Sequence, residues 1–237
     1  MTTRYALVSL FDKSGIESLS EILLSNGYHI ISTGGTYQAI YQYLSSLLED
    51  KVDKFGNKID ASRLIQVSDF TKFPEILDGR VKSLHPRIYG GILARRELPS
   101  HQNDLNKHDI PYIDVVVCNL YPFHEVNSGR STMEEATELI DIGGVTLIRA
   151  AAKNWKHVTV LIDPSDYSTF AQYLYAGTTG SPQWLMYLSS KAFNHTSNYD
   201  QMISGYLSRF KLELGKNEVE LGKNEVELGK NEVELGK

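Results

Sequence analysis

The sequence has very little of what marks a secreted, membrane-bound or nucleic-acid-binding protein. It contains one cysteine, Cys118, which excludes an internal disulfide and favours a reducing compartment. The apolar run near the N-terminus is far too short for a signal peptide or a membrane span. The formal net charge is only −5, so bulk charge predicts no nucleic-acid partner. We therefore expect a cytoplasmic globular protein without a nucleic-acid or membrane partner.

Several common catalytic and cofactor motifs are also missing. The chain has no Walker A sequence and no GxGxxG fingerprint, so nothing supports a nucleoside triphosphate or dinucleotide cofactor. No GxSxG nucleophile elbow occurs, and the cysteine and histidines lack the spacing of a zinc site. Each histidine is therefore better explained as a structural or exposed residue than as a catalytic one.

Short apolar runs alternate with helical patterns along most of the chain. The runs predict strands at residues 5–10, 28–31, 64–67, 114–120 and 158–162. Helical patterns lie between them, among them residues 132–139 and 143–152, and a helical appendage is expected at residues 181–210. Strands that alternate with helices predict an α/β fold with a mostly parallel sheet flanked by helices.

The C-terminal segment has a different composition. ELGKNEV occurs three times from Glu213 onward, with apolar residues two and five apart and a glycine in every repeat. That spacing does not suit a coiled coil, and the glycines weaken a helix. We therefore expect a domain over residues 1–210 and a disordered tail over residues 211–237. Residues 50–62 are polar and predict a surface loop.

Polar clusters follow three of the predicted strands, at residues 12–14, 33–36 and 119–123. Ligands of parallel sheets bind outside the carboxyl ends of the strands, so these clusters predict a binding site. Residues 33–36, the TGGT loop, offer backbone N–H groups and hydroxyls to a phosphate at a helix N-terminus. Lys13 would supply the counter-charge. The same residue types also occur in ordinary turns.

Two further segments carry groups suited to chemistry. Arg80 and Lys82 lie between two turn signals and before a predicted strand at residues 90–94, and in an extended segment they would share one face. Such cations suit an anionic ligand or a lysine that takes part in proton transfer, although a solvated basic loop is equally possible. Asp141 precedes two glycines, Gly143 and Gly144, that would let a ligand approach closely. The alternative is a capped amphipathic helix whose C-terminal dipole is complemented by Lys153.

Taken together, these segments closely resemble the inosine monophosphate (IMP) cyclohydrolase domain of bifunctional purine-biosynthesis proteins. In those proteins the domain precedes an aminoimidazole-carboxamide ribonucleotide transformylase domain. The resemblance covers residues 4–210 in one collinear order. The matching segments are VSLFDKSGI, ISTGGTYQAI, FPEILDGRVKSLHPRIYGGILARR, VVVCNLYPF, IDIGGVTLIRAAAKN and KAFNHTSNYD.

The resemblance implies a fold like that of methylglyoxal synthase and a hydrolase of the cyclic amidine class. Its reaction is the dehydrative ring closure of 5-formamidoimidazole-4-carboxamide ribotide to IMP in de novo purine biosynthesis. The carboxamide nitrogen attacks the formyl carbon, so the enzyme must hold that conformation, manage proton transfer and stabilise charge on the formyl oxygen. The resemblance implies no metal or organic cofactor, a purine ribonucleotide substrate and a homodimer.

The resemblance also assigns site residues, position by position. The catalytic group is Lys82, Lys153, Asp141 and Tyr121. The 5′-phosphate site is Ser9, Lys13, Thr33, Gly34, Gly35 and Thr36. The nucleotide pocket is lined by Arg80 and Asn119, to which the residue pattern adds Gly143 and Gly144.

The residue types agree with these assignments in outline. Asp141 suits a base that accepts the proton of the attacking nitrogen. Lys82 and Lys153 suit groups that stabilise the alkoxide and protonate the departing hydroxyl, in an order that the sequence leaves open. Tyr121 is either a core aromatic or a residue of the cleft that contributes to an oxyanion site.

Three features depart from the pattern of the family, and one of them is the loop at residues 50–62, which is longer than the family's usual connection. Phe11 stands where many relatives carry a serine, so we expect one hydroxyl contact to the phosphate to be missing. Residues 212–217 lie where relatives begin their transformylase domain, and here they are followed only by their own repetition. We therefore expect no transformylase activity from this chain, and a separate transformylase to supply the formylated substrate.

Two other functions are compatible with parts of the sequence. A ligand-sensing domain would use the TGGT loop but gives no reason for the four catalytic residues together. A phosphate elimination like that of methylglyoxal synthase would share the TGGT loop but not the segments CNLYPF and DIGGVTLIRAAAKN. IMP binding without turnover would favour the sensor, and methylglyoxal production from dihydroxyacetone phosphate would favour the elimination.

Overall fold

The computed structural model describes residues 3–47, 52, 59–123 and 132–234, with side chains as far as residue 208. Contacts divide the chain into two units. The first comprises Met1–Tyr121 and Asp141–Thr196, and the second comprises Pro122–Ile140 and Ser197–Lys237. The predicted boundary between a domain at 1–210 and a tail stays a prediction. Most of the predicted surface loop at 50–62 lies outside the described residues.

The first unit contains a five-stranded, fully parallel sheet in the order β3-β2-β1-β4-β5. The strands are β1 (Arg4–Ser9), β2 (Tyr28–Ser32), β3 (Leu64–Gln66), β4 (Val115–Cys118) and β5 (Thr159–Leu161). The strands predicted at residues 5–10, 28–31, 64–67, 114–120 and 158–162, and the predicted parallel sheet, are therefore confirmed. Val8 pairs with both Ser32 and Val117, so β1, β2 and β4 end at the same edge of the sheet.

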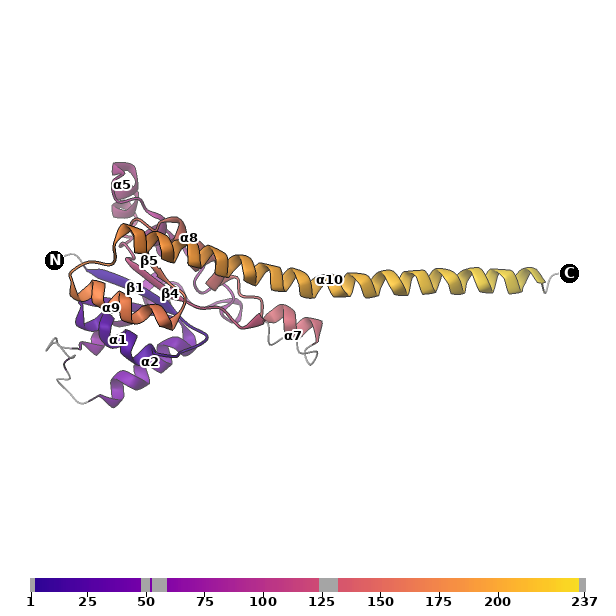
Figure 1. Ribbon diagram of the computed structural model, residues 1–237, viewed down its shortest axis with the longest axis horizontal. Coiled ribbons are helices and arrows are strands. Elements are labelled where there is room, and N and C mark those ends of the chain that lie inside the picture. The colour runs from indigo at the N-terminus through magenta and orange to yellow at the C-terminus, as the bar shows by residue number, and fades with distance from the viewer. Residues whose placement is uncertain (1–2, 48–51, 53–58, 124–131, 235–237) are drawn as a thin grey trace. The chain divides into compact units, whose positions relative to one another are not determined.

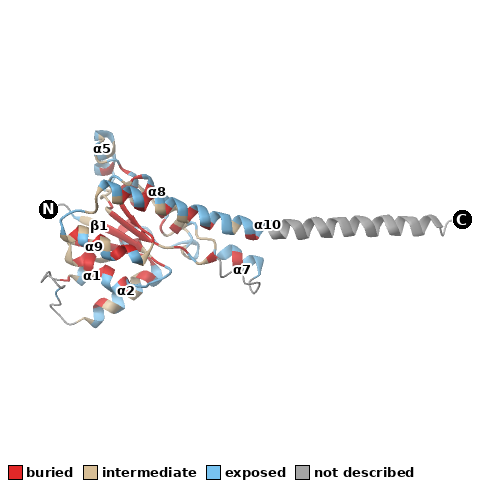
Figure 2. Ribbon diagram, viewed as in Figure 1, coloured by how far each residue is buried: buried red, intermediate tan, exposed pale blue. Residues whose placement is uncertain are grey.

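Helices cover both faces of this sheet. Figure 1 shows α1 (Ile16–Ser25), α2 (Gly34–Ser46) and α9 (Tyr167–Tyr175) on one face and α8 (Gly143–Lys153) on the other, with the first turns of α10. Most of the sheet between these layers is buried, as Figure 2 shows, whereas the edge strand β3 is only partly buried. Such burial on both faces explains why the strands are continuous apolar runs.

One predicted strand, at residues 90–94, is wrong, because residues 86–93 form the helix α4 (Pro86–Leu93). His85 begins this helix, since its side-chain Nδ1 accepts a hydrogen bond of 3.1 Å from the backbone N–H of Arg87. Pro86 then occupies the first turn, where its missing N–H costs nothing. Gly91 lets α4 lie close to the backbone of Pro111, because a Cβ on Gly91 would be 2.5 Å from the carbonyl oxygen of Pro111.

The remaining helices of the first unit are short. They are α3 (Val67–Thr71), α5 (Pro99–Lys107), and the 3-10 turns η1 (Ala61–Arg63), η2 (Leu77–Gly79) and η3 (Pro164–Asp166). None of them has the sustained apolar spacing from which a helix is easily predicted.

The second unit packs around aromatic side chains. The Phe123 ring meets the rings of Tyr199 and Tyr206 edge to face, with centroids 6.2 and 5.6 Å apart. The Tyr199 hydroxyl donates a hydrogen bond of 3.3 Å to the carbonyl oxygen of Leu139. That carbonyl follows α7 (Met133–Glu138), which begins with a capping box between Thr132 and Glu135.

Helix α10 (Pro182–Glu234) runs through residues 211–234, for which the sequence predicts disorder. The predicted helical appendage at 181–210 is confirmed, and the backbone beyond it is helical rather than irregular. Good helix formers, Glu, Lys and Leu, outnumber the single glycine in each repeat, which accounts for the difference. Among the described residues, no helix combines the length and apolar character needed to cross a membrane.

Candidate active site

The ammonium group of Lys82 lies directly against the TGGT loop. A Cβ placed on Gly34 would be 3.2 Å from Lys82 Nζ, and one placed on Gly79 would be 3.8 Å from the same atom. The structure therefore brings the predicted catalytic lysine to the predicted phosphate site, although the two are far apart in the sequence.

Lys82 reaches this position from a turn and not from an extended segment. Residues 80–83 form turns after η2, so the expectation that Arg80 and Lys82 share one strand face is wrong. Leu77, Asp78 and Gly79 all have positive φ angles, of 52°, 51° and 83°, which bend the chain sharply before Lys82. Left-handed conformations cost energy at non-glycine residues and are often found at functional sites. Arg80 lies exposed at the end of η2.

The segment that we call the TGGT loop follows β2 and consists of Thr33 and the first three residues of α2. Thr33 is the extended residue before the helix, and its Oγ1 lies 3.2 Å from Ser9 Oγ. The Thr36 hydroxyl is buried and already bonded to the backbone of Leu10, which it contacts at 2.9 and 3.0 Å. Thr36 therefore fastens the loop after β1, whereas Ser9 and Thr33 present hydroxyls near the helix N-terminus.

Asn119 and Lys13 also hold the loop after β1. The side-chain oxygen of Asn119 accepts hydrogen bonds from the backbone N–H groups of Phe11 and Asp12, at 2.7 and 3.1 Å. Its amide donates to the carbonyl oxygen of Asp12 at 2.8 Å. Lys13 Nζ donates to the carbonyl oxygen of Phe11 at 3.1 Å, and Lys13 Cε lies 4.0 Å from a Cβ placed on Gly35. The predicted counter-charge is thus beside the TGGT loop.

Asp141 lies partly buried just before α8. Its Oδ1 accepts a hydrogen bond of 2.7 Å from the backbone N–H of Gly144, and a Cβ on Gly144 would lie 2.4 Å from Oδ2. Burial raises the pKa of Asp141 above its ordinary value of 3.8, and the Gly144 hydrogen bond and the charge of Lys82 oppose that rise. The carboxyl group therefore lies close enough to Lys82 for the two charges to interact.

The two glycines at the start of α8 make room for protein side chains. Gly144 accommodates the Asp141 carboxylate and Leu120, which would lie 2.4 and 2.7 Å from a Cβ there. Gly143 accommodates Ser83, whose Oγ would lie 2.6 Å from a Cβ on Gly143. Ser83 is a site residue that the sequence analysis missed, although its position next to Lys82 was a signal for it.

Tyr121 lies at the end of the segment that follows β4, half-exposed rather than in the core. Its ring packs against the ring of Phe11, with centroids 4.8 Å apart and planes inclined at 50°. Tyr121 is therefore not a core aromatic, and its position in a cleft stays a prediction.

Lys153 is not brought to the same place. It is the last residue of α8, exposed, whereas Asp141 precedes the first residue of that helix. The helix rise separates the two ends of α8 by roughly 15 Å. The structure therefore unites Lys82, Asp141 and the TGGT loop, and it leaves Lys153 at the far end.

Cys118 is a free and buried cysteine at this edge of the sheet. Burial raises the pKa of the Cys118 thiol, and the nearby charge of Asp141 raises it further, so the neutral thiol is a poor nucleophile. In the described part of the chain, no three His, Cys, Asp or Glu residues are grouped to hold a metal ion.

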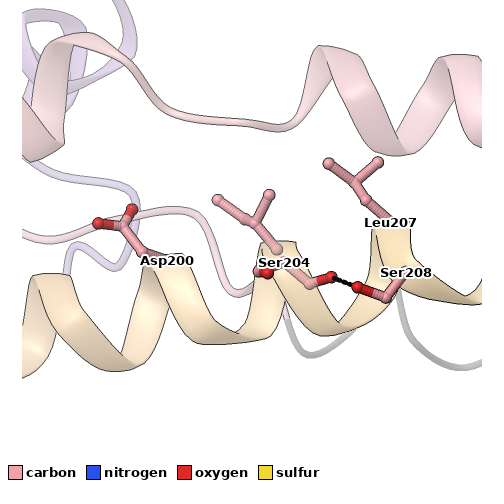
Figure 3. Close-up of a pocket in the computed structure, with 5 residues that line it drawn as sticks. Asp200, Ser204, Leu207 and Ser208 are labelled. Atoms are coloured by element: carbon pink, nitrogen blue, oxygen red, sulfur yellow. Dashed lines mark hydrogen bonds between the residues drawn. The ribbon is translucent and has the colours of Figure 1, made fainter.

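A separate pocket on α10 lies in the second unit (Figure 3) and is lined by Asp200, Ile203, Ser204, Leu207 and Ser208.

The fold and the sheet edge place the protein among the MGS-like domains, and the family of that description matches residues 57–146. A second family, described as the AICARFT/IMPCHase bienzyme, matches residues 151–234. The chain therefore carries an MGS-like domain followed by a segment that matches the AICARFT/IMPCHase family.

Individual relatives agree with this family. The bifunctional purine biosynthesis protein purH of Dictyostelium discoideum is 46% identical over 215 residues, which cover 87% of this chain and 36% of the relative. PurH of Thermoanaerobacter sp. (strain X514) is 46% identical over 203 residues, covering 85% of this chain and 37% of the relative. The chain thus spans a little over a third of the length of these relatives. The crystal structure of ForH matches with a TM-score of 0.67 and 30% identity, covering 86% of this chain and 98% of that chain.

Proposed function

We propose that this chain is an IMP cyclohydrolase, a hydrolase of purine biosynthesis that closes 5-formamidoimidazole-4-carboxamide ribotide to IMP with loss of water. The observation that carries the proposal is the position of Lys82. Its ammonium group lies against Gly34 of the TGGT loop, and its charge acts on the partly buried Asp141. One cation therefore links an anion-binding loop to a carboxylate with a raised pKa, and the match of residues 151–234 to the AICARFT/IMPCHase family supports the same reaction.

The nucleotide would bind at the carboxyl edge of the sheet. The N-terminus of α2, a helix of 13 residues, favours the negative 5′-phosphate, and Lys13 adds a positive charge beside it. Ser9 and Thr33 would supply hydroxyl donors to the phosphate. The other residues proposed for the nucleotide site are Gly34, Gly35, Thr36, Arg80, Asn119, Gly143 and Gly144. Thr36 and Asn119 would act mainly by holding the loop after β1.

Asp141 would act as the base in the first step. The substrate's carboxamide nitrogen forms a bond to the formyl carbon and gives a proton to the Asp141 carboxylate. The raised pKa brings this carboxylate closer to the proton affinity that a base near neutral pH requires. The hydrogen bond from Gly144 fixes the direction of the carboxylate oxygens.

Lys82 would stabilise the charge that develops on the formyl oxygen. Attack converts this oxygen to an alkoxide, and a nearby ammonium group stabilises that charge best in a site that excludes water. A donor hydroxyl from Tyr121 would share this task. The proton held by Asp141 passes to the alkoxide and gives a hydroxyl. Lys82 then protonates this hydroxyl, which leaves as water while the C=N bond forms, and the formamide nitrogen returns its proton to Lys82.

The proposed role of Lys153 rests on the resemblance alone. Within one chain it lies at the opposite end of α8 from Asp141, so the geometry assigns the adjacent cation to Lys82. Lys153 could reach reacting atoms only in the site of a second copy.

The setting of the reaction follows from the same family. We propose a cytoplasmic homodimer that works without a metal or organic cofactor and receives its formylated substrate from a separate transformylase. Size-exclusion chromatography with light scattering tests the dimer, and a monomer at micromolar concentration would contradict it.

A spectrophotometric cyclisation assay tests the proposed activity. The 237-residue chain should convert the formylated ribotide to IMP at a rate that is proportional to enzyme concentration. Binding of IMP with no turnover would contradict the proposal and favour a sensor. Methylglyoxal formed from dihydroxyacetone phosphate would point to phosphate elimination.

A further inference from the structure

Phe11 places a large apolar ring at the otherwise polar edge of the sheet. Its side chain is 44% exposed, as is that of Tyr121, against which it packs with ring centroids 4.8 Å apart. Each ring of the pair covers one side of the other and limits the space that is open to it.

The backbone that carries the Phe11 ring is firmly held. Its N–H donates to the side chain of Asn119 at 2.7 Å, and its carbonyl oxygen accepts from Lys13 Nζ at 3.1 Å. The preceding residue, Leu10, is bonded through both its N–H and its carbonyl oxygen to the buried Thr36 hydroxyl. The Phe11 ring therefore projects from one of the best-fixed loops of the site.

Tyr121 is held less completely by its own surroundings. It follows the buried Leu120 and precedes Pro122, which restricts its backbone but leaves the side chain free to rotate. Half-exposed side chains change rotamer on the nanosecond scale. Contact with a fixed ring restricts that rotation, so the Phe11 ring limits the directions in which the Tyr121 hydroxyl points.

We propose that Phe11 is a positioning residue that acts through Tyr121. This inference rests on the proposed cyclohydrolase function, in which the Tyr121 hydroxyl donates to the charge that develops on the formyl oxygen. Tilted aromatic pairs contribute enough free energy for roughly a twofold to tenfold change in the population of the oriented state. Phe11 would therefore change kcat rather than the affinity for substrate.

A double-mutant cycle with Tyr121→Phe tests this role. Phe11→Ala should lower kcat by about threefold to tenfold and change KM by less than about twofold. Phe11→Tyr keeps a ring in place and should restore kcat to within about twofold of wild type. In the Tyr121→Phe background, which has no hydroxyl to orient, Phe11→Ala should cause no further loss.

A second aromatic pair supplies the matched control. Tyr41 is 53% exposed on α2 and stacks on Tyr37, with ring centroids 6.1 Å apart. Tyr41→Ala should leave kcat unchanged, which separates a site effect from a general loss of exposed aromatic contacts.

Three results would overturn the inference. They are an unchanged kcat in Phe11→Ala, a loss that persists undiminished with Tyr121→Phe, and a rise in KM without a fall in kcat. The last two would show that Phe11 contacts the substrate itself. An inactive wild-type chain would instead refute the proposed function and, with it, the role of Phe11.

Discussion

The two ends of α8 have opposite characters. At the N-terminal end, Asp141 is partly buried, bonded to Gly144 and under the influence of Lys82. At the C-terminal end, Lys153 is exposed and the next residue, Asn154, is buried. The Asn154 amide donates to the carbonyl oxygens of Ile92 and Ala94 at 2.7 and 3.0 Å, so it holds the end of α4.

The difference shows that one contiguous sequence motif serves two purposes. The start of the helix supplies a carboxylate whose pKa is raised. It lies so close to Gly144 that no larger residue would fit there without displacing it. The residue after the helix ties α8 to the end of α4. Substitutions at the first end should therefore change turnover, and those at the second end should change stability.

The largest effect is expected for Lys82→Ala. Loss of the ammonium group next to Asp141 should reduce kcat by at least about a thousandfold, the upper range for removal of one stabilising donor or charge. The measurement is the cyclisation rate, with circular dichroism to confirm folding. Lys153→Ala is the matched control and should retain at least tenfold more activity than Lys82→Ala, a margin of about 1.4 kcal/mol in activation free energy. Equal losses would show that Lys153 reaches reacting atoms, from a second copy.

Asp141→Asn should lower kcat by about a hundredfold or more, because the amide cannot accept the proton of the attacking nitrogen. In wild type, activity should fall with decreasing pH at a point above 3.8, since burial raises the pKa of Asp141. A raised carboxyl pKa means that folding is favoured when the group is protonated and penalised as the pH rises through the folded-state pKa.

The same substitution should therefore have the opposite effect on stability. Above the raised pKa, Asp141→Asn should match or exceed wild type in free energy of unfolding, and that advantage should vanish below pH 3.8. Urea unfolding at several pH values measures it. A destabilised Asn variant at neutral pH would contradict the direction of the pKa shift.

Gly144→Ala should reduce kcat by about tenfold to a hundredfold. The added methyl would lie 2.4 Å from Asp141 Oδ2 and 2.7 Å from Leu120 Cδ2, so the carboxylate must move. Displacement of about 1 Å at a reacting group is enough for a loss of that size. Gly205→Ala is the control, because nothing lies within 4 Å of a Cβ at that position in α10. It should keep full activity and gain up to about 1 kcal/mol in stability from helix propensity.

Asn154→Ala should have the smallest effect on turnover and a clear effect on stability. It removes two buried hydrogen bonds and leaves two carbonyl oxygens unpaired, which should cost about 1–3 kcal/mol in free energy of unfolding. Below the melting transition, kcat should remain within about twofold of wild type. A large loss of kcat without loss of stability would place this end of α8 in the site after all.

Much of the fold could be predicted because most of its sheet is buried and all of its strands are rich in apolar residues. Their apolar composition is local, so all five strands and the parallel sheet follow from the sequence. Helix α4 could not be predicted as easily, because Gly90 and Gly91 resemble a strand or turn in composition. The close approach of Gly91 to Pro111, which explains its glycine, is visible only in three dimensions.

The site was predictable in its residue types and less so in its geometry. The TGGT loop, Lys13, Lys82 and Asp141 were expected together and lie together. Lys153 was expected with them from the resemblance alone, although the helix predicted at residues 143–152 already separates it from Asp141. Ser83 was missed because its contact is with Gly143, a residue far away along the chain.

The most direct test of the central claim is the pKa of Asp141, measured from its side-chain carboxyl carbon by NMR titration in wild type and in Lys82→Ala. We predict a pKa above 3.8 in wild type, because burial raises it, and a higher one in Lys82→Ala, because the positive charge that opposes the rise is gone. The same pKa in both proteins would show that Lys82 and Asp141 do not share a site.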